Sequence, residues 1–179
     1  LRYNSDNRLL SSESVRENGE LIVGTTYSYN DRGEMTGLVT EARMEEASKR
    51  VTMSYDDEGK IVQTVVRDAE GKVSGRTLNS YDAGGNLLEQ SSYTADGNNI
   101  STTRNEYDSM GRLVKTVVLN HARETVQILS HSYDDEDGLV DSRSSSPSAG
   151  ASSRTTFQYN DKGLPSRVDT FDKLGRLAS

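Results

Sequence analysis

The amino-acid sequence predicts an all-β protein, built as a tandem β-hairpin repeat array that forms an extended twisted antiparallel sheet or an open roll. Three observations lead to this fold class. A Tyr-(Asp or Asn)-x-x-Gly motif recurs along the chain, its tyrosines are spaced by a constant 26 residues, and a second turn signal lies between successive copies. A fixed period of this size is typical of repeat architectures, in which each unit packs only on its neighbours.

The recurring motif predicts one tight turn per repeat. Asp or Asn in the first turn position can bond its own backbone two residues further on, and Gly supplies the positive φ that closes a hairpin. The copy at Tyr133 has one inserted residue before its glycine, and the copy at Tyr3 has Asn7 in the glycine position. We therefore expect the structural residues of the repeat to be Tyr29, Gly33, Tyr55, Gly59, Tyr81, Gly85, Tyr107, Gly111, Tyr133, Gly138, Tyr159 and Gly163.

A second set of turns follows each tyrosine by twelve to sixteen residues, at residues 16–19, 68–71, 94–97 and 172–175. One repeat is then one hairpin plus the turn to the next, which predicts about thirteen antiparallel strands. The chain reads as a single array of seven units with the boundaries 3–28, 29–54, 55–80, 81–106, 107–132, 133–158 and a truncated 159–179.

The units keep this pattern to different degrees. Residues 61–66 and 113–119 are rich in β-branched residues and are the clearest strands. Residues 41–47 fall on a second turn and predict a longer loop or one helical turn, whereas the serine-rich residues 144–153 predict a flexible tip or a lost strand. Pro165 stands where a ladder donor is expected, which indicates an edge strand or a bulge.

The repeat tyrosines should share one face of the sheet, because side chains in a strand alternate between its two faces. We expect them to form a ladder that is the main apolar seam of the fold. The residues two positions before a tyrosine would fill the spaces between its rungs, among them Tyr27, Met53, His131 and Phe157.

Composition limits the partners. The chain is acidic, with a formal net charge of −7 and a pI near 4.9, which argues against nucleic acid and anionic membranes. It has no apolar run of about 18 residues, so we expect no membrane insertion, and no signal peptide is recognised. A hydrophobic content of 32% suggests a thin sheet with two wetted faces. We expect the chain to be a mature segment or a piece of a longer protein.

The motif resembles the YD repeat of Rhs-type proteins. Residues 107–114, Tyr-Asp-Ser-Met-Gly-Arg-Leu-Val, are the closest copy, and residues 55–62, 81–88 and 171–177 are similar. The resemblance implies a bacterial protein that is extracellular, on the cell surface or in the periplasm, and a hairpin sheet that can wind into a shell around another domain. It does not extend to the family's self-cleaving segment, so autoproteolysis is not expected, and seven units are too few for a closed shell.

The chemistry-bearing residues favour a structural role. There are two histidines, His121 and His131, and no cysteine, so we expect no catalytic residue, no cofactor and no metal site. The acidic run at residues 134–137 is interpreted as a turn. We expect a non-catalytic scaffold or partial shell whose partners are proteins, such as flanking domains or neighbouring repeats. The alternative is a surface adhesion module that binds a glycan or a protein along one face of the sheet.

Overall fold

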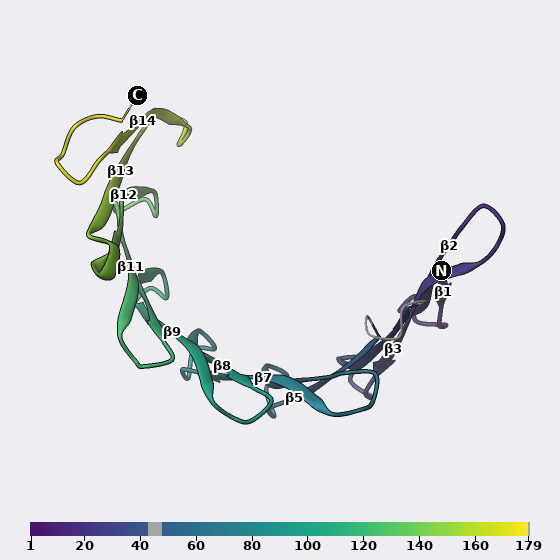
Figure 1. Ribbon diagram of the computed structural model, residues 1–179. Coiled ribbons are helices and arrows are strands. Elements are labelled where there is room, and N and C mark those ends of the chain that lie inside the picture. The colour runs from purple at the N-terminus through teal and green to yellow at the C-terminus, as the bar shows by residue number, and fades with distance from the viewer. Residues whose placement is uncertain (43–47, 179) are drawn as a thin grey trace. The chain divides into compact units, whose positions relative to one another are not determined.

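The computed structural model describes residues 1–42 and 48–178 and shows an all-β chain (Figure 1). Its fourteen strands are one more than expected, because Arg2–Tyr3 already pairs as a short first strand. The strands are β1 (Arg2–Tyr3), β2 (Leu9–Val15), β3 (Leu21–Tyr29), β4 (Met35–Ala42), β5 (Lys49–Tyr55), β6 (Ile61–Arg67), β7 (Val73–Tyr81), β8 (Leu87–Thr94), β9 (Asn99–Tyr107), β10 (Leu113–Asn120), β11 (Thr125–Tyr133), β12 (Leu139–Ser146), β13 (Ala151–Tyr159) and β14 (Pro165–Phe171).

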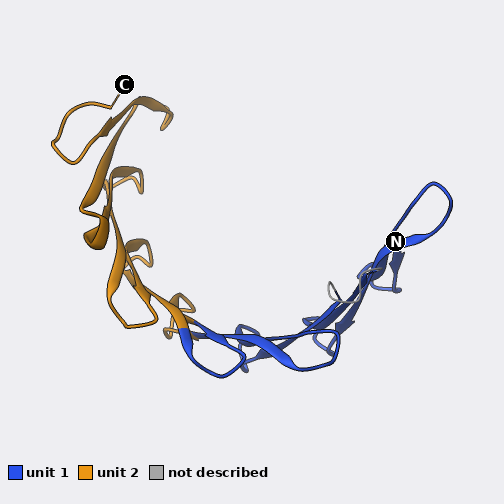
Figure 2. Cartoon of the chain, in the orientation of Figure 1, with its two compact units in different colours: residues 1–79, 92–99 blue, residues 80–91, 100–179 orange. Residues whose placement is uncertain are grey.

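The sheet order follows the chain order from β1 to β14, so each strand pairs with its predecessor and its successor. Neighbouring strands pair antiparallel, for example β3 with β4 and β10 with β11. This confirms the predicted hairpin array. Contacts divide the chain into two compact units, residues 1–79 with 92–99, and residues 80–91 with 100–178 of the described chain (Figure 2).

The ladder between the two strands that flank each tyrosine turn has a bulge beside the tyrosine. In the β3–β4 hairpin, Ser28 lies opposite Gly37 but Tyr29 lies opposite Met35, which leaves one extra residue on β4. The same register shift occurs beside Tyr55, Tyr133 and Tyr159. A bulge bends the strand and removes a regular ladder pair, so these tyrosine turns interrupt the sheet in the same way.

Few side chains of the described chain are buried. The buried set is Leu119 with the polar residues Ser91, Thr102 and Thr116. Thr102 faces Leu119 across the β9–β10 ladder, and its hydroxyl lies 2.9 Å from that of Ser91. The thin sheet expected from the low hydrophobic content is therefore what the chain forms.

Two expectations change. The sixth turn has no inserted residue: Leu139 follows Tyr133 by the same six positions that separate Leu113 from Tyr107, and Asp137, with φ 66°, takes the glycine's place. The serine-rich segment is neither a lost strand nor a flexible tip, because β12 and β13 run through it and pair from Asp141–Thr156 to Ser146–Ala151. A short 3-10 turn, η2 (Pro147–Ala149), joins them.

Two further expectations concern an irregular segment and Pro165. Glu41 and Ala42 belong to β4, and the rest of the loop expected at residues 41–47 lies outside the described residues. Pro165 begins the last strand of the sheet, β14, and pairs with Tyr159 beside a register shift. It therefore stands both on an edge strand and at a bulge, as predicted.

The turns are held by their first residue. The N–H of Asp108 donates to the carbonyl of Arg112 at 3.0 Å, and the carbonyl of Asp108 accepts the N–H of Gly111 at 3.0 Å. Its Oδ1 accepts the N–H groups of Met110 and Arg112 at 2.9 and 3.0 Å. The Oδ1 atoms of Asn4, Asp134, Asn160 and Asp172 likewise each accept two backbone N–H groups.

The backbone at Gly111 has φ 79°, a conformation that a β-branched residue adopts only under strain. Gly111→Val should lower the free energy of unfolding by about 1–3 kcal/mol. Met110→Val introduces the same side chain one position earlier, at an exposed residue of the same turn, and should change it by less than about 0.5 kcal/mol. Chemical denaturation measures both, and equal stability of the two variants would refute the turn assignment.

Candidate functional site

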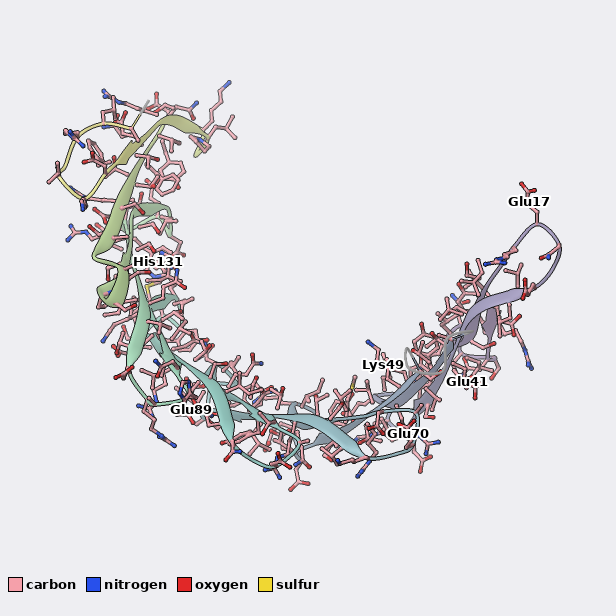
Figure 3. All side chains as sticks on the ribbon, viewed as in Figure 1. Glu17, Glu41, Lys49, Glu70, Glu89 and His131 are labelled. Atoms are coloured by element: carbon pink, nitrogen blue, oxygen red, sulfur yellow. The ribbon has the colours of Figure 1, made fainter. Side chains whose placement is uncertain are left out.

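The repeat tyrosines lie at the end of every second strand, and from Tyr29 to Tyr159 each is half-buried. Each immediately precedes the Asp or Asn that holds the turn, and a bulge lies beside Tyr29, Tyr55, Tyr107, Tyr133 and Tyr159. Since strand side chains alternate between faces, the tyrosine shares its face with the residue two positions earlier. Figure 3 shows the side chains that cover the ribbon.

Each tyrosine hydroxyl for which a bond is described donates to a backbone carbonyl of the preceding repeat, 20 residues earlier. These bonds join neighbouring repeats, whereas the turn bonds act within one repeat. They run from Tyr29 to Leu9 at 2.8 Å, from Tyr107 to Leu87 at 3.1 Å, from Tyr133 to Leu113 at 2.8 Å, from Tyr159 to Leu139 at 2.9 Å, and from Tyr55 to Met35.

The accepting carbonyl lies beyond the last ladder pair between repeats. The register of β4 with β5 ends at Gly37 opposite Thr52, two residues short of Met35. The registers of β2 with β3, β10 with β11 and β12 with β13 end at the equivalent pair. The tyrosine hydroxyl thus continues the inter-repeat hydrogen bonding past the point where the backbone ladder stops. We name this bond the tyrosine lock.

The residues two positions before the tyrosines make different contacts beside the tyrosine lock. Asn79 and Asn105 donate from Nδ2 to the carbonyls of Ile61 and Leu87, at 2.8 and 2.9 Å. Met53 brings its sulfur to 3.8 Å from the Tyr55 hydroxyl. The buried Nδ1 of His131 has no hydrogen-bond partner among residues 1–42 and 48–178. The predicted apolar seam is therefore a mixed one, in which amide hydrogen bonds at Asn79 and Asn105 occur as well as the contact of the Met53 sulfur with Tyr55.

Long side chains tie neighbouring turns together. Arg112 bonds Asp108 of its own turn at 2.7 Å, and its Nη1 reaches Asp137 Oδ1 at 2.7 Å and the Asp134 carbonyl at 3.2 Å in the next turn. Its guanidinium also lies 4.9 Å from the Tyr133 ring centroid. Arg32 makes a similar bridge to the carbonyl of Asp57 at 3.0 Å. The turns thus form a second line of contacts from repeat to repeat.

This stacking gives some turn glycines a second role. The guanidinium of Arg8, from the preceding turn, already occupies the space that a Cβ on Gly33 would need. The carboxylate of Glu34 likewise occupies the space that a Cβ on Gly59 would need. Both glycines also have positive φ. A side chain at either position would have to displace the neighbouring repeat's side chain as well as strain its own backbone.

Hydrogen bonds lower the pKa of several turn carboxyls. For Asp108 the main cause of the lowered pKa is the hydrogen bond from the backbone N–H of Arg112, followed by that from the Arg112 side chain. For Asp82 the main cause is the side chain of Asn86, and for Asp172 it is the side chain of Arg176. The pKa of the Tyr55 hydroxyl is raised, mainly by burial and then by nearby Glu34. Asp82, Asp108 and Asp172 are consequently held in their ionised form, in which they accept the turn hydrogen bonds.

The two histidines lie apart in the sheet, and carboxylates of the acidic turn already make hydrogen bonds or an ion pair. His121 lies in the β10–β11 turn and His131 on β11, labelled in Figure 3. Within the acidic turn, Asp134 accepts two backbone N–H groups and Asp137 pairs with Arg112. No group of three or more His, Cys, Asp or Glu residues in the described ranges could hold a metal ion. No helix in those ranges is long and apolar enough to cross a membrane.

A hollow lies on the first compact unit. It has a volume of about 670 Å³ and is lined by parts of β4, β5 and β6 and by the turn after β6. Arg50 and Arg67 face each other across the β5–β6 ladder within it, and Glu41, Lys49 and Glu70 lie around it (Figure 3). The lining carries both signs of charge, and the hollow is shallow.

Comparisons with known proteins define the fold and the family. A chain in the structure of the Photorhabdus luminescens Tc holotoxin pore aligns with a TM-score of 0.64 and 13% identity, over 93% of this chain and 9% of that one. A porin-like protein from Bacteroides uniformis aligns with a TM-score of 0.53 and 14% identity, over 98% of this chain and 84% of that one. At these identities the likeness shows the fold alone.

The geometry and these likenesses define a β-hairpin repeat sheet as the class of protein. A search of curated protein sequences gave no match. A family model with the description "Uncharacterised protein" matches residues 5–104, more than half of the chain, and the chain belongs to that family. The chain spans less than a tenth of the toxin chain that it resembles.

Sequence reasoning found the tyrosines but missed their acceptors. The acceptor is a main-chain carbonyl, and the residue that carries it is Leu9, Met35, Leu87, Leu113 or Leu139, none of which has a polar side chain to mark it. The only available signal was the constant spacing of the tyrosines. A constant spacing is what a bond between fixed positions of successive repeats requires.

Removing one hydroxyl tests the tyrosine lock. Tyr29→Phe should lower the free energy of unfolding by about 0.5–1.5 kcal/mol, because the Leu9 carbonyl loses its donor. Tyr27→Phe on the same strand is the matched control and should have little effect, since no bond of its hydroxyl is described. Denaturant titration of the two variants measures the difference, and an equal loss of stability would show that the Tyr29–Leu9 bond contributes nothing.

The lowered pKa of Asp108 predicts a pH dependence. Its stabilising contribution is present above the ordinary aspartate pKa of 3.8 and is lost as the pH falls through the lower value of the folded state. Asp108→Asn keeps an oxygen acceptor in the turn, as Asn30 and Asn160 do, and should flatten the loss of stability below about pH 4.

The reverse substitution is the control. Asn160→Asp places a carboxyl at the same turn position of another repeat and should steepen the acid dependence. Thermal midpoints between pH 2 and 7 give both slopes. An acid profile of Asp108→Asn that coincides with the unsubstituted chain would contradict the role of this carboxylate.

Proposed function

We propose that this chain is a YD-repeat, or Rhs-repeat, segment that serves as a structural scaffold or partial shell of a bacterial extracellular protein and performs no catalysis. The observation that carries the proposal is the tyrosine lock. The same hydroxyl–carbonyl bond recurs at the same position of successive repeats, so the most regular feature of the molecule joins one repeat to the next.

The unit of the scaffold is the 26-residue repeat. We propose the seven units 3–28, 29–54, 55–80, 81–106, 107–132, 133–158 and 159–179, in which Tyr29, Tyr55, Tyr107, Tyr133 and Tyr159 donate to the preceding unit. The positive-φ turn position is held by a glycine, except for Asn7 in the first unit and Asp137 in the sixth. Nearest-neighbour bonds of this kind let an array lengthen without a new core, because each repeat depends only on its two neighbours.

The polar side chains support a mechanical role. The turn aspartates accept backbone hydrogen bonds, and arginines such as Arg112 connect one turn to the next. Side chains that a catalytic site would need free are used here to hold turns. The fold likeness to a chain of the Tc holotoxin pore supports a place within a larger assembly, with flanking domains or neighbouring repeats as partners, at the cell surface or outside the cell.

A surface adhesion module is the second candidate. The hollow that contains the facing Arg50 and Arg67 favours it, because two guanidinium groups on adjacent strands can bind carboxylate or sulfate groups of an acidic glycan. The mixed charge of its lining, with Glu41 and Glu70, weakens that attraction. The scaffold function is therefore the better supported of the two.

Binding measurements on the chain and imaging of the natural full-length protein separate the candidates. The scaffold function predicts no saturable binding to a panel of neutral, sialylated and sulfated glycans, and flanking repeats or domains packed on this segment in an electron cryo-microscopy map. Saturable glycan binding that is lost in the Arg50→Ala/Arg67→Ala variant, with an unchanged thermal midpoint, would replace the scaffold with the adhesion module.

A further inference from the structure

The turn between β2 and β3 contains an asparagine followed directly by a glycine, Asn18 and Gly19, beside the Glu17 labelled in Figure 3. None of the other glycines of the chain follows an asparagine. Both residues are exposed. An asparagine carboxamide lies next to the peptide nitrogen of the following residue, and the two can close a succinimide ring because they are held together in one chain. The pair is therefore a candidate site of chemical self-modification.

The turn folds the side chain of Asn18 back over the backbone that follows it. Its Oδ1 accepts the N–H of Glu20 at 3.1 Å, which brings the carboxamide close to the intervening peptide group. Gly19 has no side chain to hinder its own nitrogen, and no other atom lies within 4 Å of the place where its Cβ would be. The N–H of Gly19 donates to the Arg16 carbonyl at 2.9 Å, so this turn bond must open before the nitrogen reacts.

Other asparagines have a folded-back side chain but a different following residue. Asn120 and Asn160 each accept the N–H two residues further on at 2.9 Å, in the manner of Asn18. They are followed by His121 and Asp161, whose side chains hinder attack by the peptide nitrogen. The following glycine, and not the folded-back carboxamide alone, distinguishes the first turn from these two.

We propose that Asn18 is a self-modification site, at which the peptide nitrogen of Gly19 attacks the Asn18 Cγ. The N–Cγ bond forms and the Cγ–Nδ2 bond breaks, and the amide group leaves as ammonia with the proton that the peptide nitrogen gives up. Water then opens the succinimide at either of its carbonyl carbons. Opening at Cγ leaves aspartate, whereas opening at the main-chain carbonyl carbon leaves isoaspartate, in which the chain runs through Cβ and Cγ.

The fold distinguishes the two products. Aspartate already occupies the equivalent place in the fourth unit, where Asp96 precedes Gly97 and the Gly97 N–H donates to the Thr94 carbonyl at 3.1 Å. Isoaspartate adds a main-chain carbon to a turn that is closed by the bond from the Arg16 N–H to the Glu20 carbonyl, at 2.9 Å. The added carbon should break that closure and loosen the adjoining part of the β2–β3 ladder.

Peptide mass mapping during incubation of the chain at mildly alkaline pH tests the reaction. Asn18 should lose its amide at least about tenfold faster than Asn160, which corresponds to a barrier lower by about 1.4 kcal/mol. Asp96→Asn places an asparagine before a glycine in the equivalent turn and should create a second fast site. Ala122→Asn places one before Arg123, which also has positive φ, and should stay slow. Equal rates at Asn18 and Asn160, or at the two introduced asparagines, would overturn the proposal.

Hydrogen exchange tests the structural consequence. The isoaspartate form, separated by chromatography, should lose amide protection at residues 14–15 and 21–23, the ladder pairs next to the turn. Asn18→Asp should keep this protection, since it carries the same charge on an unaltered backbone. Equal protection in these two forms would refute the loosening of the hairpin by isoaspartate.

Discussion

The hydrogen bond from a repeat tyrosine to a carbonyl of the preceding repeat, made by Tyr29, Tyr55, Tyr107, Tyr133 and Tyr159, is the interaction on which this fold depends. The tyrosine turn requires a bulge, and the bulge ends the regular ladder between repeats. A buried carbonyl without a partner is unfavourable, and the phenol of the next repeat supplies that partner. Donor and acceptor stay in reach only while the repeat keeps its length, which explains why the tyrosines recur without drift over seven units.

The same bond accounts for the composition. A sheet joined by backbone ladders, turn carboxylates and tyrosine hydroxyls needs little buried apolar volume, and Leu119 is the sole buried large apolar side chain in the described ranges. The net charge of −7 is tolerated because many acidic groups sit in turns, where N–H groups and arginines stabilise them. Low hydrophobic content, which in a globular chain would indicate disorder, is here the composition of a single-layer repeat.

The hairpins and their turns could be predicted because local residue types determine them: Asp or Asn opens the turn, and Gly, as at Gly111, supplies positive φ. The role of Pro165 was predictable for the same reason. Bridges such as Arg112 to Asp137 could not be predicted, because they depend on which turns become neighbours in the sheet. The sixth turn has its glycine one position late, at Gly138, which suggested an inserted residue; the unchanged distance from Tyr133 to Leu139 excludes an insertion. The serine-rich segment was wrongly predicted to lose its strand because its side chains are small and polar. The ladder there, for example at Ser144–Ser153, is made by backbone groups and does not depend on the side chains.

Hydroxyl-proton exchange of the tyrosines, followed by NMR with ring-labelled tyrosine, tests the tyrosine lock most directly. Tyr29, Tyr107, Tyr133 and Tyr159 donate to carbonyls and should exchange their hydroxyl protons more slowly than Tyr27, which shares a strand with Tyr29. Exchange at the same rate in all five would mean that the hydroxyls face water, and the bond between repeats would not exist as described.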